Sequence, residues 1–118
     1  MTTFFGFALA DSMFTGDCTI SRQVISPEQA SDVIASAIKH GSFKSCLNPS
    51  HVATIEAAKS RFGIEVEIPI SPPQVSLKFG DKLVVMGVRG LPRLTDRHEY
   101  SAEEIEKAAF SFSLYEIE

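Results

Sequence analysis

The sequence predicts a single α+β domain, spanning residues 1–118, in which one mixed sheet of about five to six strands carries about three helices. Three observations lead to this prediction. Short apolar segments alternate with polar residues, as half-buried strands do. Capped helix starts are interspersed among these segments. The length of 118 residues, with 44% hydrophobic and 22% charged residues, is ordinary for one globular domain.

The first third of the chain predicts two strands and a helix. Residues 3–10 form a continuous apolar run, typical of a strand that is covered on both faces, and residues 18–25 alternate loosely, as a more exposed strand does. Ser26-Pro27-Glu28-Gln29 predicts a helix start, because serine can cap the helix, proline suits its first position and Gln29 completes a capping box. Gly41 ends this helix and begins a polar loop over residues 41–47.

A second helix start follows at Asn48-Pro49. Asn48 can cap the helix and Pro49 suits its first turn, so Ser50 and His51 are expected within that turn. Gly63 ends this helix.

The rest of the chain, from residue 64 on, predicts three strands, a final helix and a closing strand. Residues 64–70 and 75–79 alternate as half-buried strands do, and Gly80-Asp81 predicts a tight hairpin turn into a central strand at 83–88. A charged loop over residues 89–100 follows. Ser101-Ala102-Glu103-Glu104 then predicts a third capped helix, and residues 110–115 predict a last strand.

The composition excludes several classes of function. A net charge of −4 argues against a protein that coats nucleic acid, so no duplex nucleic acid is expected as a partner. No apolar run approaches the roughly 20 residues that cross a bilayer, and the apolar N-terminus lacks the positive start of a signal peptide. We therefore expect a cytoplasmic protein without a membrane partner. Cys18 and Cys46 are expected to be free thiols.

The second helix start is the first candidate for chemistry. Unpaired amides and the positive end of the helix dipole form an anion site there, which Ser50 and His51 would face. A bound phosphate would favour the charged imidazole, which could donate a proton to a leaving oxygen near neutral pH. The alternative is an exposed histidine without a function, and the spacing alone leaves both interpretations open.

The charged loop over residues 89–100 is the second candidate. Arg93 suits a phosphate, and Asp96 could orient a histidine or an attacking hydroxyl, although a solvated loop is the alternative. Ser12 and Thr15, which follow the first strand, could line a site from a loop. His40 closes the first helix and is expected to be structural, and His98 has no assigned role. The sequence contains no P-loop, GxGxxG, HExxH or GxSxG motif, and we expect neither a metal nor a cofactor.

Several of these motifs, taken in order along the chain, resemble one known family. The helix from His51 through Thr54 to Gly63 resembles a Gly-His-x-x-Thr helix that ends in glycine. Gly80-Asp81-Lys82 is similar to that family's charged turn before a hydrophobic strand. Arg93-Leu94-Thr95-Asp96, followed by the capped helix, is similar to its Arg-Leu-x-Glu loop. The family is that of the viral ring nucleases, also called type III anti-CRISPR proteins, with relatives in bacteria.

The resemblance implies a homodimer that binds cyclic tetra-adenylate, a cyclic oligoadenylate, across its subunit interface. Such proteins cleave this messenger of type III CRISPR signalling, without a metal, to linear di-adenylate with a 2′,3′-cyclic phosphate. The resemblance implies that His51 is the general acid, that Arg93 holds phosphate and that Asp96 takes the place of a family glutamate. It also implies substrate contacts from the loop after the first strand, at Asp11 and Ser12, and from Ser50.

The sequence also departs from the family pattern. Ser50 stands where the family has glycine, Asp96 is one methylene shorter than glutamate, and Ser71-Pro72-Pro73 replaces an Asn-Arg pair. These departures leave a non-catalytic nucleotide-binding or regulatory dimer of the same fold as the alternative function. His40 offers a competing match to the family histidine, but it lies at the end of a helix and not at its start.

Overall fold

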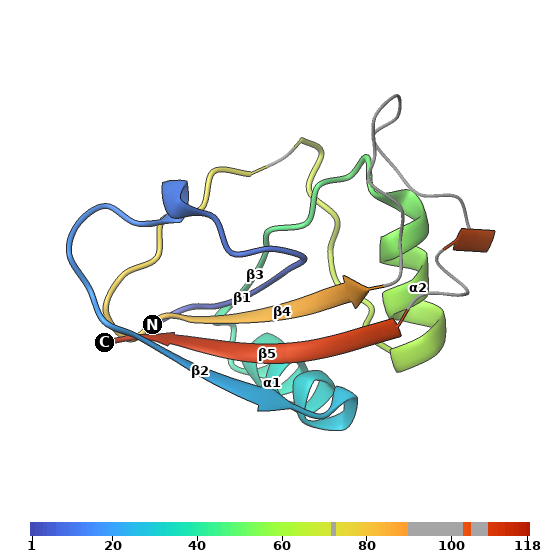
Figure 1. The fold of residues 1–118 in the computed structure, drawn as a ribbon, viewed down its shortest axis with the longest axis horizontal. Helices are drawn as coiled ribbons and strands as arrows, with labels where there is room; N and C mark the ends of the chain where they lie inside the picture. Colours follow the sequence, from blue (N-terminus) through green and yellow to red (C-terminus); the bar gives the residue numbers. More distant parts are fainter. Residues whose placement is uncertain (72, 90–102, 105–108) are drawn as a thin grey trace.

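The computed structural model describes residues 1–71, 73–89, 103–104 and 109–118. The elements in chain order are β1 (Thr3–Gly6), the 3-10 helix η1 (Asp11–Met13), β2 (Ile20–Ile25), α1 (Pro27–Lys39), β3 (Phe43–Ser45), α2 (Val52–Phe62), β4 (Lys82–Arg89) and β5 (Ala109–Ile117). The strands form a single mixed sheet in the order β2-β5-β4-β1-β3 (Figure 1). The expected α+β class and single mixed sheet are confirmed.

The topology brings three strand ends to one edge of the sheet. β1 is parallel to both of its neighbours, β3 and β4, whereas β5 runs antiparallel to β4 and β2. Because parallel strands end at the same edge, β1, β3 and β4 all end there, at Gly6, Ser45 and Arg89. In open sheets with parallel strands, ligands bind outside the carboxyl ends of the strands.

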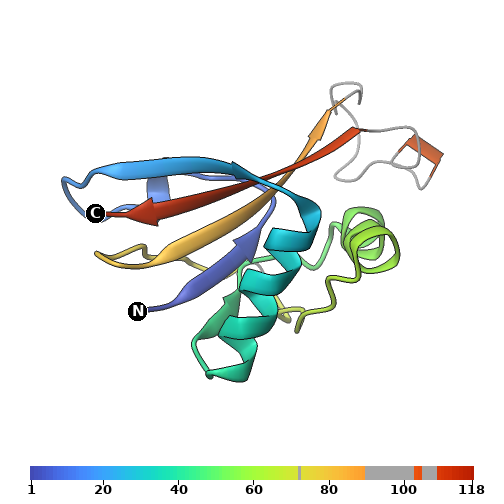
Figure 2. The same cartoon turned by 90° about the horizontal axis from the view of Figure 1, so that it is seen from below.

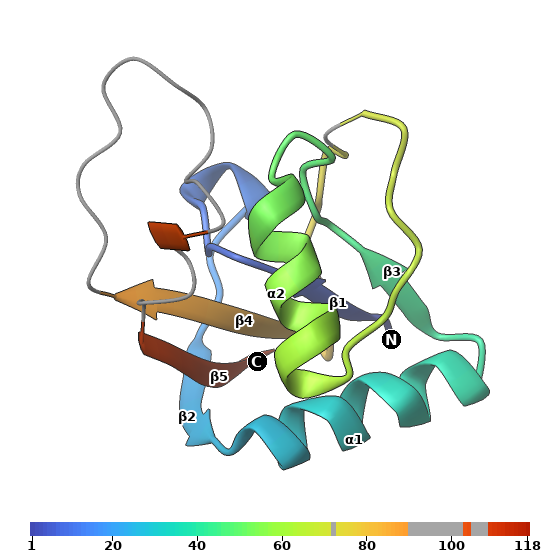
Figure 3. The same ribbon diagram turned by 90° about the vertical axis from the view of Figure 1, so that its right-hand side faces the viewer.

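Both α-helices cover the same face of the sheet (Figure 2). α1 begins as predicted: the Ser26 hydroxyl accepts a hydrogen bond from the Gln29 amide at 3.1 Å, and the Gln29 side chain accepts one from the Ser26 amide at 2.9 Å. α2 packs beside α1 (Figure 3). The buried cluster between the sheet and this helical layer comprises Phe5, Ile25, Ala30, Ile34, Leu47, Ala58, Ile64, Val84, Met86 and Phe112.

On the opposite face, segments without regular strands cover β1 and β4. The buried residues of this second cluster are Phe4, Leu77, Leu83 and Ile117, and Met13 and Val75 pack against them. The Leu77 amide donates a hydrogen bond of 2.7 Å to the carbonyl of Met13, which fastens the two covering segments to each other.

Two of the expected strands, over residues 64–70 and 75–79, are absent from the sheet. Residues 64–70 form no strand, and of residues 75–79 only Leu77 forms an isolated bridge, with Phe14. Prolines within and between these segments remove amide donors that a strand ladder needs.

The predicted hairpin at Gly80-Asp81 is also wrong, because β4 pairs with β1 and β5. The Asp81 carboxylate instead accepts hydrogen bonds of 2.9 Å from the amides of Thr2 and Lys78. It thereby ties this turn to the start of β1 and not to a preceding strand.

Further differences concern the ends of the elements. β1 ends at Gly6 and not at residue 10, because Leu9 turns onto the second cluster. β3 occupies part of the expected polar loop at 41–47. The described residues contain two α-helices instead of three; the third expected helix lies largely outside them, although Glu103 and Glu104 are helical. None of the described helices is long and apolar enough to span a membrane.

Candidate functional site

Two of the segments singled out in the sequence follow parallel strands and meet the same edge of the sheet. Asp11 and Ser12 lie in η1, after β1, and Ser50 and His51 lie between β3 and α2. Arg93 and Asp96 follow β4, but they lie outside the described residues, as does His98. The topology therefore brings the described candidates to the same edge of the sheet, one group after β1 and the other after β3.

The start of α2 differs from the expectation. The helix begins at Val52 with His51 as its N-cap, and not with Asn48. The Asn48 side-chain oxygen accepts hydrogen bonds from the Ser50 amide at 3.0 Å and the Ser50 hydroxyl at 2.8 Å. The His51 amide donates to the Asn48 carbonyl at 3.0 Å. Asn48 thus closes a turn of its own, which asparagine favours, and this turn places His51 at the N-cap position of α2.

The ring of His51 is positioned by aromatic packing. It lies against Phe7, with ring centroids 6.3 Å apart, and Phe7 in turn packs edge-on against Phe5 at 5.8 Å. Phe5 is fully buried, so this row connects His51 to the core. Within the described part of the chain, neither ring nitrogen of His51 has a hydrogen-bond partner. No residue in the described ranges therefore blocks either nitrogen from a ligand.

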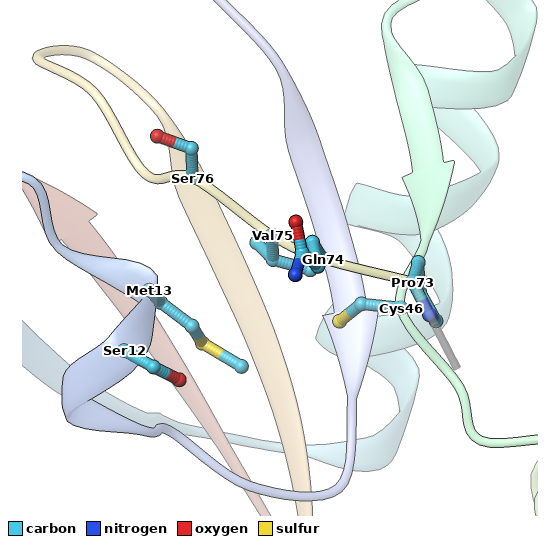
Figure 4. Close-up of a pocket in the computed structure, with 7 residues that line it drawn as sticks. All are labelled: Ser12, Met13, Cys46, Pro73, Gln74, Val75 and Ser76. Carbon is cyan, nitrogen blue, oxygen red and sulfur yellow. The ribbon is translucent and has the colours of Figure 1, made fainter.

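A cavity of about 530 Å³ lies beyond the same edge, against the second core cluster. Its lining consists of Ser12, Met13, Cys46, Pro73, Gln74, Val75 and Ser76 (Figure 4). Of these residues, only Ser12 is a site residue predicted from the sequence. The others carry no recognisable motif, because the walls come from η1, the end of β3 and an irregular segment that are distant from one another in the sequence.

Cys46 is a packing residue of this cavity and not a nucleophile. Its thiol donates a hydrogen bond of 3.1 Å to the Phe5 carbonyl. Burial raises the pKa of Cys46 to about 11, so the thiol stays protonated at neutral pH. Both Cys46 and the exposed Cys18 are free thiols, which confirms the expectation from the sequence.

The remaining candidates are His40 and a metal site. His40 is the C-cap residue of α1, and its Nδ1 lies 2.7 Å from the Ser36 carbonyl oxygen, which agrees with a structural role. Across residues 1–71, 73–89, 103–104 and 109–118, no three His, Cys, Asp or Glu side chains are grouped so that they could hold a metal ion.

The chain is a small α+β protein in which polar segments follow the parallel strands β1 and β3 at one edge of a five-stranded sheet. No protein-family model and no curated protein matches the sequence. Among solved structures, the chain is similar to B116 of Sulfolobus turreted icosahedral virus, with a TM-score of 0.73 over 98% of this chain and 99% of that chain. The two sequences are 18% identical, so the likeness establishes a shared fold.

Proposed function

We propose that the protein is a metal-independent ring nuclease that binds cyclic tetra-adenylate as a homodimer. The observation that carries this proposal is the placement of His51 at the N-terminus of α2, with a ring that no described residue engages by hydrogen bonding. The positive end of the helix dipole favours a phosphate there. The fold shared with a viral protein agrees with the resemblance of the sequence motifs to viral ring nucleases.

In the proposed reaction, a ribose 2′-hydroxyl attacks the adjacent phosphorus. A P–O2′ bond forms as the 2′-hydroxyl loses its proton to solvent, the P–O5′ bond breaks, and the departing 5′-oxygen takes a proton from the His51 imidazolium. Arg93 would hold the phosphate, and Asp96 would orient the reacting groups. A two-fold dimer would present two such sets to a symmetric ring, so that two cuts yield two di-adenylates with 2′,3′-cyclic phosphates.

The neighbouring side chains set the conditions for this reaction. The Ser50 hydroxyl is bonded to Asn48, so Ser50 supports the turn before His51 and would contact substrate only after that bond opens. Asp11 and Ser12, on the other side of β1, would contact a different part of the ring. The extra side chain at Ser50 favours the second candidate function, a dimer of the same fold that sequesters a nucleotide without cleaving it.

The deciding experiment measures cleavage and binding separately. The purified protein is incubated in EDTA with radiolabelled cyclic tri-, tetra- and hexa-adenylate, beside His51→Ala and the matched control His40→Ala. We expect cleavage of the tetra-adenylate ring, a loss of roughly 10²- to 10⁴-fold in His51→Ala and an unchanged rate in His40→Ala.

Three other results would change the conclusion. Equal cleavage by His51→Ala would remove His51 from the mechanism. Tight binding by the wild type without cleavage would establish the sequestering dimer in place of the nuclease. The absence of both binding and cleavage would refute a nucleotide function.

A further inference from the structure

We infer that the cavity between η1 and residues 73–76 binds one adenine base of the ligand, and that Gln74 determines the preference for adenine. This inference rests on the proposed function, because it takes from it that the ligand is an adenylate. The cavity opens where the parallel strands end, and its volume of about 530 Å³ lies in the range of small-molecule sites.

The walls of the cavity suit a flat aromatic ring. Met13 and Val75 pack against the second core cluster, which fixes their positions. The side chains of Met13 and Cys46 point toward the cavity from opposite sides (Figure 4). Thioether sulfur makes favourable contacts with aromatic rings, and the protonated thiol of Cys46 adds a neutral surface. The hydrogen bond of 2.7 Å from Leu77 to Met13 keeps the two walls together.

The rim supplies polar groups that are free to bind a ligand. Ser12, Gln74 and Ser76 are exposed, and none of their side chains has a hydrogen-bond partner among the residues that the structure describes. A glutamine amide offers one donor and one acceptor side by side, which matches N7 and the N6 amino group of adenine. Guanine presents two acceptors at the same edge, so the amide of Gln74 discriminates against it.

The lining also indicates which part of a nucleotide enters. None of the described residues that line the cavity is charged, whereas phosphates are held by arginines, lysines and helix N-termini. The start of α2, with His51, provides the phosphate-binding position at the same edge. Base and phosphate are thus assigned to different groups of residues.

The three methionines of the chain allow a direct test. With ¹³C-methyl methionine, Met13 reports on the cavity, Met86 on the buried core of the other face, and Met1 on the exposed N-terminus. On addition of adenosine 5′-monophosphate or cyclic tetra-adenylate, we expect the Met13 methyl resonance to shift and the Met86 resonance to stay. A Met13→Leu variant assigns the resonance.

Affinity provides the second readout. Gln74→Leu is expected to raise the Kd for cyclic tetra-adenylate by about 5- to 150-fold, as loss of a paired amide contact does, and to abolish the preference of the monophosphate for adenine over guanine. Gln23→Leu is the matched control, because Gln23 is an exposed glutamine on β2, the outermost strand on the side of the sheet away from β1 and β3. An unchanged Met86 resonance shows that each variant is folded.

The outcomes separate this inference from the proposed function. Binding and cleavage of the ring without a Met13 shift would overturn the base pocket and leave the nuclease intact. A Met13 shift that Gln74→Leu weakens, in a protein that cleaves no ring, would support the pocket and refute the nuclease. Equal affinities of Gln74→Leu and Gln23→Leu would overturn the assignment of Gln74.

Discussion

Gly6, the last residue of β1, is packed so closely against Cys46 that a methyl group there cannot be accommodated without movement. A Cβ atom at position 6 would lie 2.6 Å from the Cys46 sulfur. That sulfur is half-buried and bonded to the Phe5 carbonyl at 3.1 Å, so its displacement breaks a contact. We therefore predict that Gly6→Ala is destabilising in the wild-type background and that Cys46→Ala relieves the effect.

The magnitude follows from two opposing contributions. Overfilling a packed site costs about 1–3 kcal/mol, whereas replacing glycine with alanine in a strand otherwise gains roughly 0.5–1 kcal/mol. Cys46→Ala removes the clashing atom and leaves only the gain. The coupling energy of Gly6→Ala with Cys46→Ala is therefore expected to be about 1–3 kcal/mol.

Urea unfolding of the wild type, both single variants and the double variant measures this coupling. Gly6→Ala should lower the free energy of unfolding less in the Cys46→Ala background, or raise it. Cys46→Ser is the control, because it keeps a hydrogen-bond donor near the Phe5 carbonyl. If Gly6→Ala has the same effect in both backgrounds, the close packing of β1 against Cys46 does not limit position 6, and the reasoning fails.

Three further predictions concern the site and its support. Phe7→Leu removes the ring beside His51, so the ring-proton resonances of His51 should shift, whereas Phe7→Tyr should leave them near their wild-type positions; unshifted resonances in Phe7→Leu would contradict the packing. Asp81→Ala removes the acceptor for two amides and should lower the free energy of unfolding by about 3–6 kcal/mol, at about 1.5–3 kcal/mol for each hydrogen bond. Asp81→Asn keeps one acceptor oxygen and should lower it by about half as much. Equal losses in the two variants would refute the conclusion that both carboxylate oxygens accept a hydrogen bond. Because burial raises the pKa of Cys46 to about 11, iodoacetamide at pH 8 should modify the exposed Cys18 and spare Cys46. Labelling of Cys46, measured by mass spectrometry, should rise only toward pH 11. Equal labelling of the two cysteines at pH 8 would show that Cys46 is an accessible thiolate.

The sequence predicts those elements whose signal is local. The capping box at Ser26 and Gln29 starts α1 where it is expected, and the apolar runs of β4 and β5 are visible because strands buried in the middle of a sheet carry continuous or alternating apolar residues. Free cysteines also follow from composition. Each of these features depends on a few neighbouring residues.

Features that depend on pairing between distant segments could not be predicted in this way. β3 has three residues, Phe43–Ser45, too few to display a period, and it exists because Phe4 and its neighbours in β1 pair with it. Residues 64–70 alternate for another reason. Ile64 is buried in the core and Val66 packs against it, whereas Ile68 and Ile70 are exposed, so burial accounts only for the first half of the alternating segment. The cavity has no local signal, because three separate segments build it.

The two groups of candidate site residues lie on opposite faces of the sheet at the end of β1. Phe7, which contacts His51, packs against the core cluster on the helical face, whereas Met13 and Cys46 pack against the cluster on the other face. A ligand that reaches both groups must pass across the end of β1, which favours an oligonucleotide over a single nucleotide. We therefore expect adenosine 5′-monophosphate to shift the Met13 methyl resonance but not the His51 ring resonances, and cyclic tetra-adenylate to shift both. If the monophosphate shifts both equally, one compact pocket serves base and phosphate, and no ring is needed to connect them.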